Sequence, residues 1–560
     1  MRLIRTFLNQ SIQVSLMLMA STAVFAAPNA GELLQQQQPS ASITPQPAVH
    51  IDAPNITNTV LMSDTRLSIG KIIIQGNQQF SASQLHSLVA EAEGKILTFN
   101  ELNQLVERIT KYYHDHGYAY SRAYLPEQTL SSGVIRINVL EAIYGKSVVN
   151  NESHLKPSLV EATLAPLKSG EPVNSDQLQY RLMLLNRLSG INLHAVLSPG
   201  AQVGESQLTT HINDSKRLGG YLGIDNFGNQ YTGETRGSAT ISAYNMLGLG
   251  DELSLSGLTA GSDLNYGRVS YAATLNGAGT RLAASYASLD YKLGDNLKAL
   301  GAEGKAKKTN VTLNQLAWSG KNGQVLASLS YDYKQLEDDI TANEFYKHRD
   351  IEVVSARLDG TNIDSAFGGG LTQYGIGTSF GQVDFKNADA RQLDTNTANT
   401  AGHYHSVNAS LSRLQNLGRR GTQGYVGVYG QYSPYNLDSA EQFLIGGPAN
   451  VRGYKPSVAA GSSGYYATAE LRQPLYRTAD QQVGGKLFVD TASVKLNAKP
   501  WDGVTGDNTM SLHSFGLGLN WESRWHIKAN AEVAFPFGDK PSQLGEQDNK
   551  QYWLNLTKTF

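Results

Sequence analysis

The sequence predicts an all-β membrane protein, a barrel of about 16 antiparallel strands. In the final segment, Tyr552 to Phe560, apolar residues alternate with mostly polar ones and the last residue is aromatic. A strand with one apolar face suits a wall between lipid and water. About sixteen such alternating segments follow one another from Arg217 to Phe560. Beyond the N-terminal leader, we find no apolar run long enough to span a membrane as a helix, which leaves a closed barrel.

The composition agrees with this fold class. The 560-residue chain has 55 Gly and 28 Tyr, and its mean hydropathy is -0.31. Barrels hide their hydrophobicity in alternation and look polar on average, while tyrosine suits the lipid headgroup region. The chain has no Cys, which excludes disulfides, thiolate catalysis and Cys-ligated metals. The net charge of -2 argues against a nucleic-acid-binding protein.

The N-terminus predicts export from the cytoplasm. Two arginines among the first five residues precede a short apolar stretch, Ile12 to Phe25, and Val24-Phe25-Ala26 is a suitable cleavage site. This pattern is typical of a secretory signal peptide, residues 1–26, with the mature chain beginning near Ala27. An exported barrel protein is expected in the outer membrane of a Gram-negative bacterium.

A short helix and a linker follow this leader. The segment Gly31 to Gln38, which includes Leu33 and Leu34, predicts a polar helix within residues 27–38. Proline, which cannot continue a helix, comes directly after it. Residues 39–66 are rich in Pro, Ser, Thr and Ala and are expected to form an extended linker.

Two small units of similar layout come next, at residues 67–141 and 142–214. In the first, a capping-box pattern at Ser81 to Gln84 begins one helix, and Asn100 to His116 carries apolar residues at helical spacing. Strands flank these helices, so the order is strand, helix, helix, strand, strand. The second unit repeats this order, with Ser175 to Leu188 as its second helix. Each unit is therefore predicted to be an α+β domain with a three-stranded sheet whose rim is open.

The barrel is predicted to cover residues 215–560 and to enclose water. Alternation is clear in Gln324 to Tyr333 and in Trp525 to Phe537, where the outward face is apolar and the other face carries His, Lys, Asn and Glu. A barrel of about sixteen strands has an aqueous lumen unless something fills it. A soluble β-sandwich, the alternative, would not be expected to have such long apolar outer faces.

A long loop interrupts the series of strands. It spans about Ser433 to Ser462, between the eleventh and twelfth segments, and contains the sequence Gly446 to Tyr454. The thirteenth segment includes Lys486 to Ala492, and its alternation places Phe488 and Asp490 toward the lumen.

With the two units that precede the barrel, these motifs resemble the outer-membrane transporters of two-partner secretion systems, the TpsB family, relatives of the barrel-assembly insertase. Val451-Arg452-Gly453-Tyr454 matches the family's V-R-G-[YF] loop signature. Phe488-x-Asp490-x-Ala492 matches F-x-D-x-G except that Ala replaces Gly, which puts a close approach at that position in doubt. The small units are similar to POTRA domains through residues Tyr113, Gly117, Tyr118, Ala123, Pro126, Gly133, Val139 and Glu141. The resemblance covers nearly all of the mature chain.

The resemblance implies that the long loop folds into the lumen and brings Arg452 to Asp490. A buried guanidinium needs an acceptor, and a carboxylate offers two oxygens that match its fork geometry. Losing one partner would leave a buried charge uncompensated, at a cost of about 3–5 kcal/mol in a well-buried site. The alternative is that Arg452 is an ordinary exposed loop arginine.

The resemblance further implies protein export. The POTRA-like domains would bind a secreted exoprotein, typically large and β-helical, by adding an extended segment to their sheet rims. That chain would cross the lumen and fold outside the cell, and the folding free energy would drive the process. The helix with Leu33 and Leu34 matches the family's lumenal plug in position. Other expected partners are outer-membrane lipid and the barrel-assembly machinery that inserts the protein, whereas no cofactor, metal, nucleic acid or catalytic residue is expected.

The sequence leaves alternatives. A barrel-assembly insertase has a similar barrel and loop but normally more periplasmic domains, a porin would lack these domains, and a barrel hydrolase would need a triad that we do not find. The segment Gly377 to Gly381 fits the G-x-S-x-G pattern, but it lies in a strand rather than at a strand-to-helix elbow. His114-Asp115-His116 lies at a helix end without an obvious third metal ligand.

Overall fold

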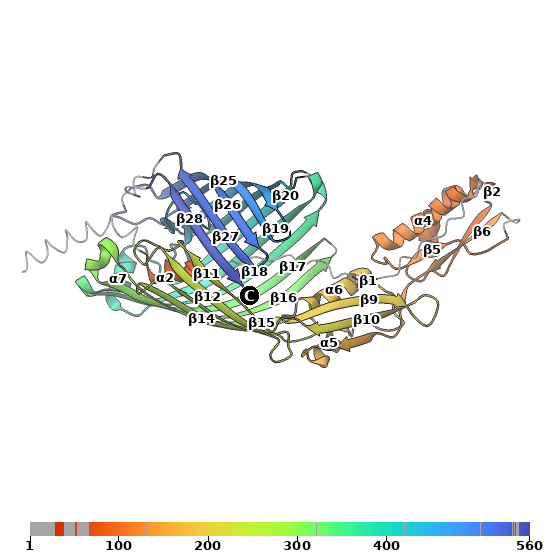
Figure 1. Ribbon diagram of the computed structural model, residues 1–560, viewed down its shortest axis with the longest axis horizontal. Coiled ribbons are helices and arrows are strands. Elements are labelled where there is room, and N and C mark those ends of the chain that lie inside the picture. The colour runs from red at the N-terminus through yellow and green to blue at the C-terminus, as the bar shows by residue number, and fades with distance from the viewer. Residues whose placement is uncertain are drawn as a thin grey trace, which may run out of the picture.

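The protein consists of a β-barrel with two small domains in a row at one end (Figure 1). The computed structural model describes residues 28–37, 51–52, 66–129, 133–320, 322–418, 420–504, 506–539, 541, 544 and 548–560. The predicted signal peptide and most of the predicted linker lie outside these residues. Among the helices described, none combines the length and apolar character that crossing a bilayer requires.

The first small domain has the predicted strand, two helices and two strands in order, and it adds two short strands, one before this series and one between the helices. Its elements are β2 (Arg66–Ser68), β3 (Lys71–Gln75), α3 (Ala82–Ser87), β4 (Ile96–Thr98), α4 (Phe99–Asp115), β5 (Arg122–Tyr124) and β6 (Val134–Leu140), with a 3-10 turn at Ala90–Ala92. The main sheet has the order β3-β6-β5, and β2 pairs with β4 beside it. Capping boxes begin both helices, from Ser81 to Gln84 and from Thr98 to Glu101. The predicted capping box at Ser81 is therefore confirmed.

The second small domain differs from the prediction in two ways. Its elements are β7 (Ile143–Tyr144), β8 (Val148–Asn151), α5 (Pro157–Leu164), α6 (Ser175–Asn186), β9 (Ile191–Pro199) and β10 (Glu205–Asp214). The first strand of the predicted order is divided into β7 and β8, which both pair with β10. The sheet also has five strands rather than the predicted three, and one of them, β1 (Ile51–Asp52), pairs with Ala195 and Val196 at one rim.

Sixteen strands within the described residues form a closed barrel, which confirms the predicted fold class. In order they are β11 (Leu218–Asp225), β12 (Arg236–Tyr244), β13 (Glu252–Thr259), β14 (Leu264–Thr274), β15 (Arg281–Lys292), β16 (Ala302–Gly320), β17 (Gly323–Ile340), β18 (Phe345–Asp364), β19 (Gly370–Phe385), β20 (Gly402–Asn416), β21 (Gln423–Tyr432), β24 (Ser463–Arg477), β25 (Gln481–Lys495), β26 (Thr509–Ser523), β27 (Ile527–Pro536) and β28 (Gln551–Thr559). All neighbours are antiparallel, and β28 closes the barrel against β11 through the pairs from Tyr221↔Thr559 to Asp225↔Asn555.

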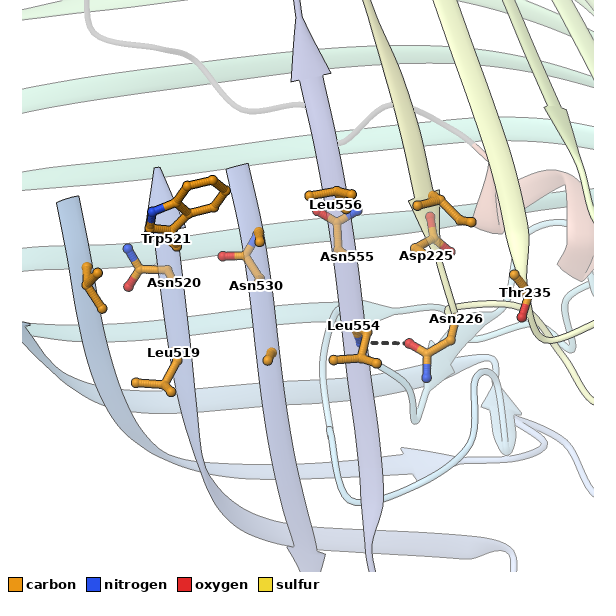
Figure 2. Close-up of a pocket in the computed structure, with 14 residues that line it drawn as sticks. Asp225, Asn226, Thr235, Leu519, Asn520, Trp521, Asn530, Leu554, Asn555 and Leu556 are labelled. Carbon is orange, nitrogen blue, oxygen red and sulfur yellow. Dashed lines mark hydrogen bonds between the residues drawn. The ribbon is translucent and has the colours of Figure 1, made fainter. Parts of the chain in front are cut away.

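The outer face of the barrel is apolar, as the alternation predicts. On β28 the side chains of Tyr552, Leu554 and Leu556 point outward and are about half exposed, whereas Trp553 points inward and is buried. An apolar depression lies on the outer face where β26, β27, β28 and β11 run side by side (Figure 2). It forms because the small Ala529 and Ala531 lie between larger neighbours on β26 and β28.

The second small domain docks onto the turns at the near end of the barrel. The Tyr180 hydroxyl on α6 donates to the carbonyl of Leu316 at 3.0 Å, and Lys156 N donates to the carbonyl of Gly248 at 2.9 Å. Gly248 has φ +74°, and a Cβ there would lie 2.7 Å from the carbonyl oxygen of His154. This turn therefore requires glycine for its conformation and for the close approach.

Candidate lumenal site

The loop between β21 and β24 folds into the barrel. It contains a short hairpin of β22 (Phe443–Ile445) and β23 (Ala459–Gly461), which packs against β24 and β25. We call residues 433–462 the lumenal loop. Its side chains share a buried apolar cluster with the barrel wall, formed by Ile445, Val451, Tyr454, Ala459, Tyr466, Ala492, Val494, Leu496, Met510 and Leu512. The loop is therefore packed like a domain core rather than exposed to the lumen.

Asn450 and two glycines fold the tip of the lumenal loop back on itself. Gly446 and Gly447 have φ values of +96° and +105°, which residues other than glycine rarely adopt. The side-chain carbonyl of Asn450 accepts from the backbone N–H of Gly446 at 2.6 Å and of Val451 at 2.7 Å. This turn directs the next residue, Arg452, toward the wall.

Arg452 is buried against Asp490 on β25. Its Nη2 lies 2.7 Å from Asp490 Oδ1 and its Nε lies 2.9 Å from Oδ2, which is a bidentate pair. The backbone N–H of Arg452 also donates to Oδ2 at 3.2 Å. Arg452 is 4 % exposed and Asp490 is fully buried, so Arg452 is not an exposed loop arginine.

Three further wall residues complete the environment of the guanidinium. Nη1 of Arg452 donates to Glu470 on β24 at 2.7 Å and to Glu532 on β27 at 3.3 Å, and Nη2 donates to the Thr468 hydroxyl at 3.1 Å. Lys486 pairs with Glu532 at 2.8 Å, and Arg472 pairs with Glu470 at 2.7 Å. Three cations thus meet three carboxylates, and we call Arg452, Arg472, Lys486, Glu470, Asp490 and Glu532 the Arg452 cluster.

Sequence reasoning found only two members of the Arg452 cluster. Glu470, Thr468 and Glu532 belong to no motif, but each lies on the lumenal face of its strand. The available signal was the presence of carboxylates at inward positions of the twelfth and fifteenth strands, because a lumenal charge needs a partner.

The other predicted signature residues lie around the same point. The Phe488 ring lies under the guanidinium, with Arg452 Cζ 3.5 Å from the ring centroid. Val451 and Tyr454 are buried in the apolar cluster. A Cβ on Gly453 would lie 2.6 Å from Ser514 Cβ, so glycine permits this close contact with the wall. Ala492 is fully buried within a regular run of β25, so its Cβ is accommodated without a turn.

The last strand also contacts the lumenal loop. Trp553 on β28 donates from its indole Nε1 to the carbonyl of Arg452 at 2.7 Å. Trp553 lies on the inward face of its strand, and no sequence motif includes it. Loop and closing strand are therefore joined directly.

A helix lies inside the barrel, at the lumenal position implied for the plug. This helix, α2, spans Ala30–Gln36, slightly shorter than the predicted Gly31 to Gln38. Asn29 caps its N-terminus, and its Leu33 and Leu34 are buried against a cluster of wall residues that includes Leu289, Tyr291 and Leu336. Figure 1 shows α2 within the ring of strands.

α2 is bonded both to the wall and to the lumenal loop. Ala30 N donates to Asp338 Oδ1 on β17 at 2.7 Å. Gln36 donates to the Ser457 hydroxyl at 2.8 Å, and the Ser439 hydroxyl donates to Asn29 at 2.7 Å. The two lumenal elements therefore contact each other as well as the barrel.

Arg349 on β18 joins the wall to the residues that contact α2. It is fully buried, with Nε 2.5 Å from Asp438 Oδ2 in the lumenal loop and Nη1 2.7 Å from Asp338 Oδ2. Nη2 donates to the Ser439 hydroxyl at 3.1 Å. No sequence motif includes Arg349, Asp338 or Asp438, and only their inward strand positions and loop location could have indicated them.

Glu32 is the acidic residue of α2. Burial, reinforced by the nearby carboxylates of Asp338 and Asp438, raises the pKa of Glu32 from 4.5 to about 8, although hydrogen bonds with Asn29 lower it. The docked helix therefore favours the protonated form of this side chain.

The two weaker motifs lie in ordinary secondary structure. Gly377 to Gly381 lies in the middle of β19, and the hydroxyl groups of Ser379 and Ser355 are 2.8 Å apart on neighbouring strands. The strand-to-helix elbow is absent from this segment. His114 and His116 bond to backbone carbonyls, and Asp115 pairs with Lys111 at 2.5 Å. The part of the chain that the structure describes contains no group of three or more His, Asp and Glu residues that could hold a metal ion.

Comparison with known proteins relates the whole architecture to secretion transporters. The sequence profile of the family described as haemolysin secretion/activation protein ShlB/FhaC/HecB matches residues 204–520, and that of the ShlB-type POTRA domain matches residues 67–142. The chain is 27 % identical over 493 residues to the haem/hemopexin transporter protein HuxB of Haemophilus influenzae, covering 88 % of this chain and 86 % of the relative. It is 25 % identical over 507 residues to the outer membrane transporter CdiB of Escherichia coli, covering 84 % and 82 %. The solved structure of CdiB from Escherichia coli superposes with a TM-score of 0.72 at 19 % identity, covering 94 % of this chain and 95 % of that one.

Proposed function

The chain belongs to the haemolysin secretion/activation protein family ShlB/FhaC/HecB, and we propose that it exports one partner exoprotein by releasing two elements that obstruct its lumen. It is an outer-membrane β-barrel transporter of the two-partner secretion type, with POTRA domains in the periplasm. Its family consists of transporters, which favours export over barrel insertion, and we propose that it has no enzyme activity. The proposed divisions are a signal peptide (1–26), plug helix (27–38), linker (39–66), POTRA domains (67–141 and 142–214) and barrel (215–560).

The observation that carries this proposal is the double obstruction of the barrel. α2 and the lumenal loop both lie inside it, and buried ion pairs hold the loop through Arg452 and Arg349. Such pairs are weak contributors to net stability but are costly to break one partner at a time. Such ion pairs therefore suit a loop that switches between two defined positions better than a loop that moves continuously.

In the proposed sequence of events, the periplasmic domains bind an unfolded exoprotein first. α2 then leaves the lumen. The lumenal loop shifts with it, because Gln35 and Gln36 of α2 donate hydrogen bonds to Ser439 and Ser457 of the loop, respectively. The exoprotein crosses the barrel and folds at the cell surface, where its folding free energy prevents return. Arg452 and Asp490 position the lumenal loop, with Val451, Gly453, Tyr454 and Phe488 completing its docking surface.

The partner classes follow from the same architecture. The exoprotein is the principal partner, and the names of relatives include transporters for haem/hemopexin and haemolysin systems. We propose that outer-membrane lipid covers the apolar outer face, including the depression beside Trp521 and Leu554 (Figure 2). The barrel-assembly machinery is the proposed partner for insertion.

Co-expression tests the proposed function. The protein is produced with a candidate exoprotein from a neighbouring reading frame, and exoprotein in the medium is quantified. Secretion is expected with the wild type and should fall sharply on deletion of residues 67–214, whereas the levels of other outer-membrane barrels should not change. A general loss of barrels after depletion of this protein would instead identify an insertase.

A further inference from the structure

Cations gather on one side of the barrel lumen. The strand register places Arg268 on β14 opposite Ala287 on β15, Ala287 opposite Lys308 on β16, and Lys308 opposite Lys334 on β17. All of these are inward positions of their strands. Like charges directly opposite each other in a sheet are destabilising. The row therefore requires carboxylates nearby.

The adjoining strand, β18, adds further cations to this row. We call Arg268, Lys308, Lys334, Lys347 and Arg349 the basic strip. Two carboxylates of the wall bind within it, since Asp332 pairs with Lys308 at 3.2 Å and Asp338 pairs with Arg349 at 2.7 Å. The basic strip thus has more cations than these wall carboxylates balance.

The lumenal loop supplies further negative charge to the basic strip. Glu441 of the loop pairs with Lys334, and Asp438 Oδ2 lies 2.5 Å from Arg349 Nε. Only 5 % of the Lys334 side chain and none of the Arg349 side chain is exposed. The docked loop therefore both neutralises and covers these two cations.

Arg452 has the converse effect on the opposite wall, where it brings positive charge to the three carboxylates of the Arg452 cluster. These carboxylates belong to β24, β25 and β27, the twelfth, thirteenth and fifteenth strands, whereas β16 to β18 are the sixth to eighth. The two groups of strands lie across the lumen from each other (Figure 1). A shift of the loop therefore uncovers positive charge on one wall and negative charge on the other.

We propose that the basic strip is a binding surface for acidic side chains of the exoprotein in transit, which take the places of Asp438 and Glu441. This inference rests on the proposed function for the identity of the chain that crosses the lumen. An extended segment with acidic residues at every second position presents its carboxylates on one face. Hydrated ion pairs are individually weak, so each contact forms and breaks readily and the segment keeps moving.

Acylation of lysine tests whether the loop carboxylates cover the basic strip. A water-soluble amine-acylating reagent is added to the full-length protein in detergent, and modified lysines are located by mass spectrometry. The variant Asp438→Asn/Glu441→Gln should acylate at Lys334 about tenfold faster than the wild type, because its loop no longer binds the wall cations. Lys305 and Lys307, exposed on the outer face of β16, are the internal reference and should react equally in both proteins. An unchanged rate at Lys334 would overturn the proposal.

Block of open channels in planar bilayers tests the binding of carboxylates. A hexaglutamate peptide should block wild-type channels about tenfold longer than the neutral hexaglutamine peptide. The variant Lys308→Gln/Lys334→Gln should lose this difference. The matched control Lys305→Gln/Lys307→Gln removes the same charge from the outer face of β16 and should keep it. Equal block of the wild type by the two peptides would refute the binding surface without reference to any variant.

Cross-linking during secretion separates this proposal from the function on which it rests. A carbodiimide joins a carboxylate directly to an amine, and an exoprotein is stalled in the barrel by a folded domain at its C-terminus. Cross-links to Lys308 or Lys334 are expected, and a stalled exoprotein without them would refute the proposed path. If the wild type secretes no exoprotein, the proposed function fails, and the peptide block still decides whether the basic strip binds carboxylates.

Discussion

Removal of the Arg452 side chain should release the lumenal loop from the wall. Arg452→Ala leaves the carboxylates of Asp490, Glu470 and Glu532 close together, with 0 %, 7 % and 15 % of their side chains exposed. Breaking one partner out of a buried ionic site costs about 3–5 kcal/mol. Since about 1.4 kcal/mol corresponds to a tenfold change in an equilibrium constant, the undocked population of the loop should rise roughly a hundredfold to a thousandfold.

Thiol labelling measures this population. Ala492 is fully buried beneath the lumenal loop, so a cysteine at this position reacts only when the loop moves away. In an Ala492→Cys background, Arg452→Ala should raise the labelling rate by about two to three orders of magnitude. Arg452→Lys keeps the charge but loses the fork geometry, and it should give an intermediate rate.

Arg472→Ala is the matched control for this measurement. Arg472 also bonds to Glu470, but 40 % of its side chain is exposed, so its loss should change labelling by less than about tenfold. If the labelling rate of the Arg452→Ala variant lies within threefold of the rate in the Ala492→Cys background, the Arg452 cluster does not hold the loop, and the reasoning fails.

Three further predictions concern the plug helix and the wall. Docking of α2 raises the pKa of Glu32 from 4.5 to about 8, so between these pH values Glu32 is protonated in the docked helix and ionised in the released helix. Docking then requires uptake of a proton, and its free energy therefore becomes less favourable as the pH rises through this range. Channel opening in planar bilayers should therefore increase from pH 6 to pH 9 in the wild type and stay flat in Glu32→Gln; equal slopes would contradict this. Arg349→Met removes the cation that binds Asp438, and it should increase opening at neutral pH by about a hundredfold, measured as open probability; an unchanged open probability would exclude Arg349 from plug retention. Gly516→Ala would place a Cβ 2.2 Å from the Val533 carbonyl oxygen and 2.4 Å from the Phe488 ring, and it should lower the free energy of unfolding by about 1–3 kcal/mol in denaturant titrations, with Gly267→Ala, which meets no atom within 4 Å, as the neutral control. Equal stability of the two variants would show that the neighbouring strand and Phe488 move aside without cost.

The fold was largely predictable because the lipid–water boundary imposes a period of two on every barrel strand. Alternation placed the strands, the outward face of β28 and the inward positions of Phe488 and Asp490. Helix capping at Ser81 and apolar spacing in α4 were equally local signals. Each of these predictions depends on neighbouring residues alone.

The remaining parts of the site depend on residues that are distant in sequence. Arg349 meets Asp438, 89 positions away, and Trp553 meets Arg452, 101 positions away. No local pattern encodes such a pair, because each member looks like an ordinary polar or aromatic residue on an inward face. The β1–β9 pairing was missed for the same reason, since two residues within a linker carry no strand signal.

The bond from Trp553 to the lumenal loop has a consequence for biogenesis. Trp553 belongs to β28, and the same strand closes the barrel by pairing with β11. The lumenal loop can therefore make its full set of contacts only in a barrel whose strand β28 is also in place to pair with β11. Completion of the wall and sealing of the pore thus become one step.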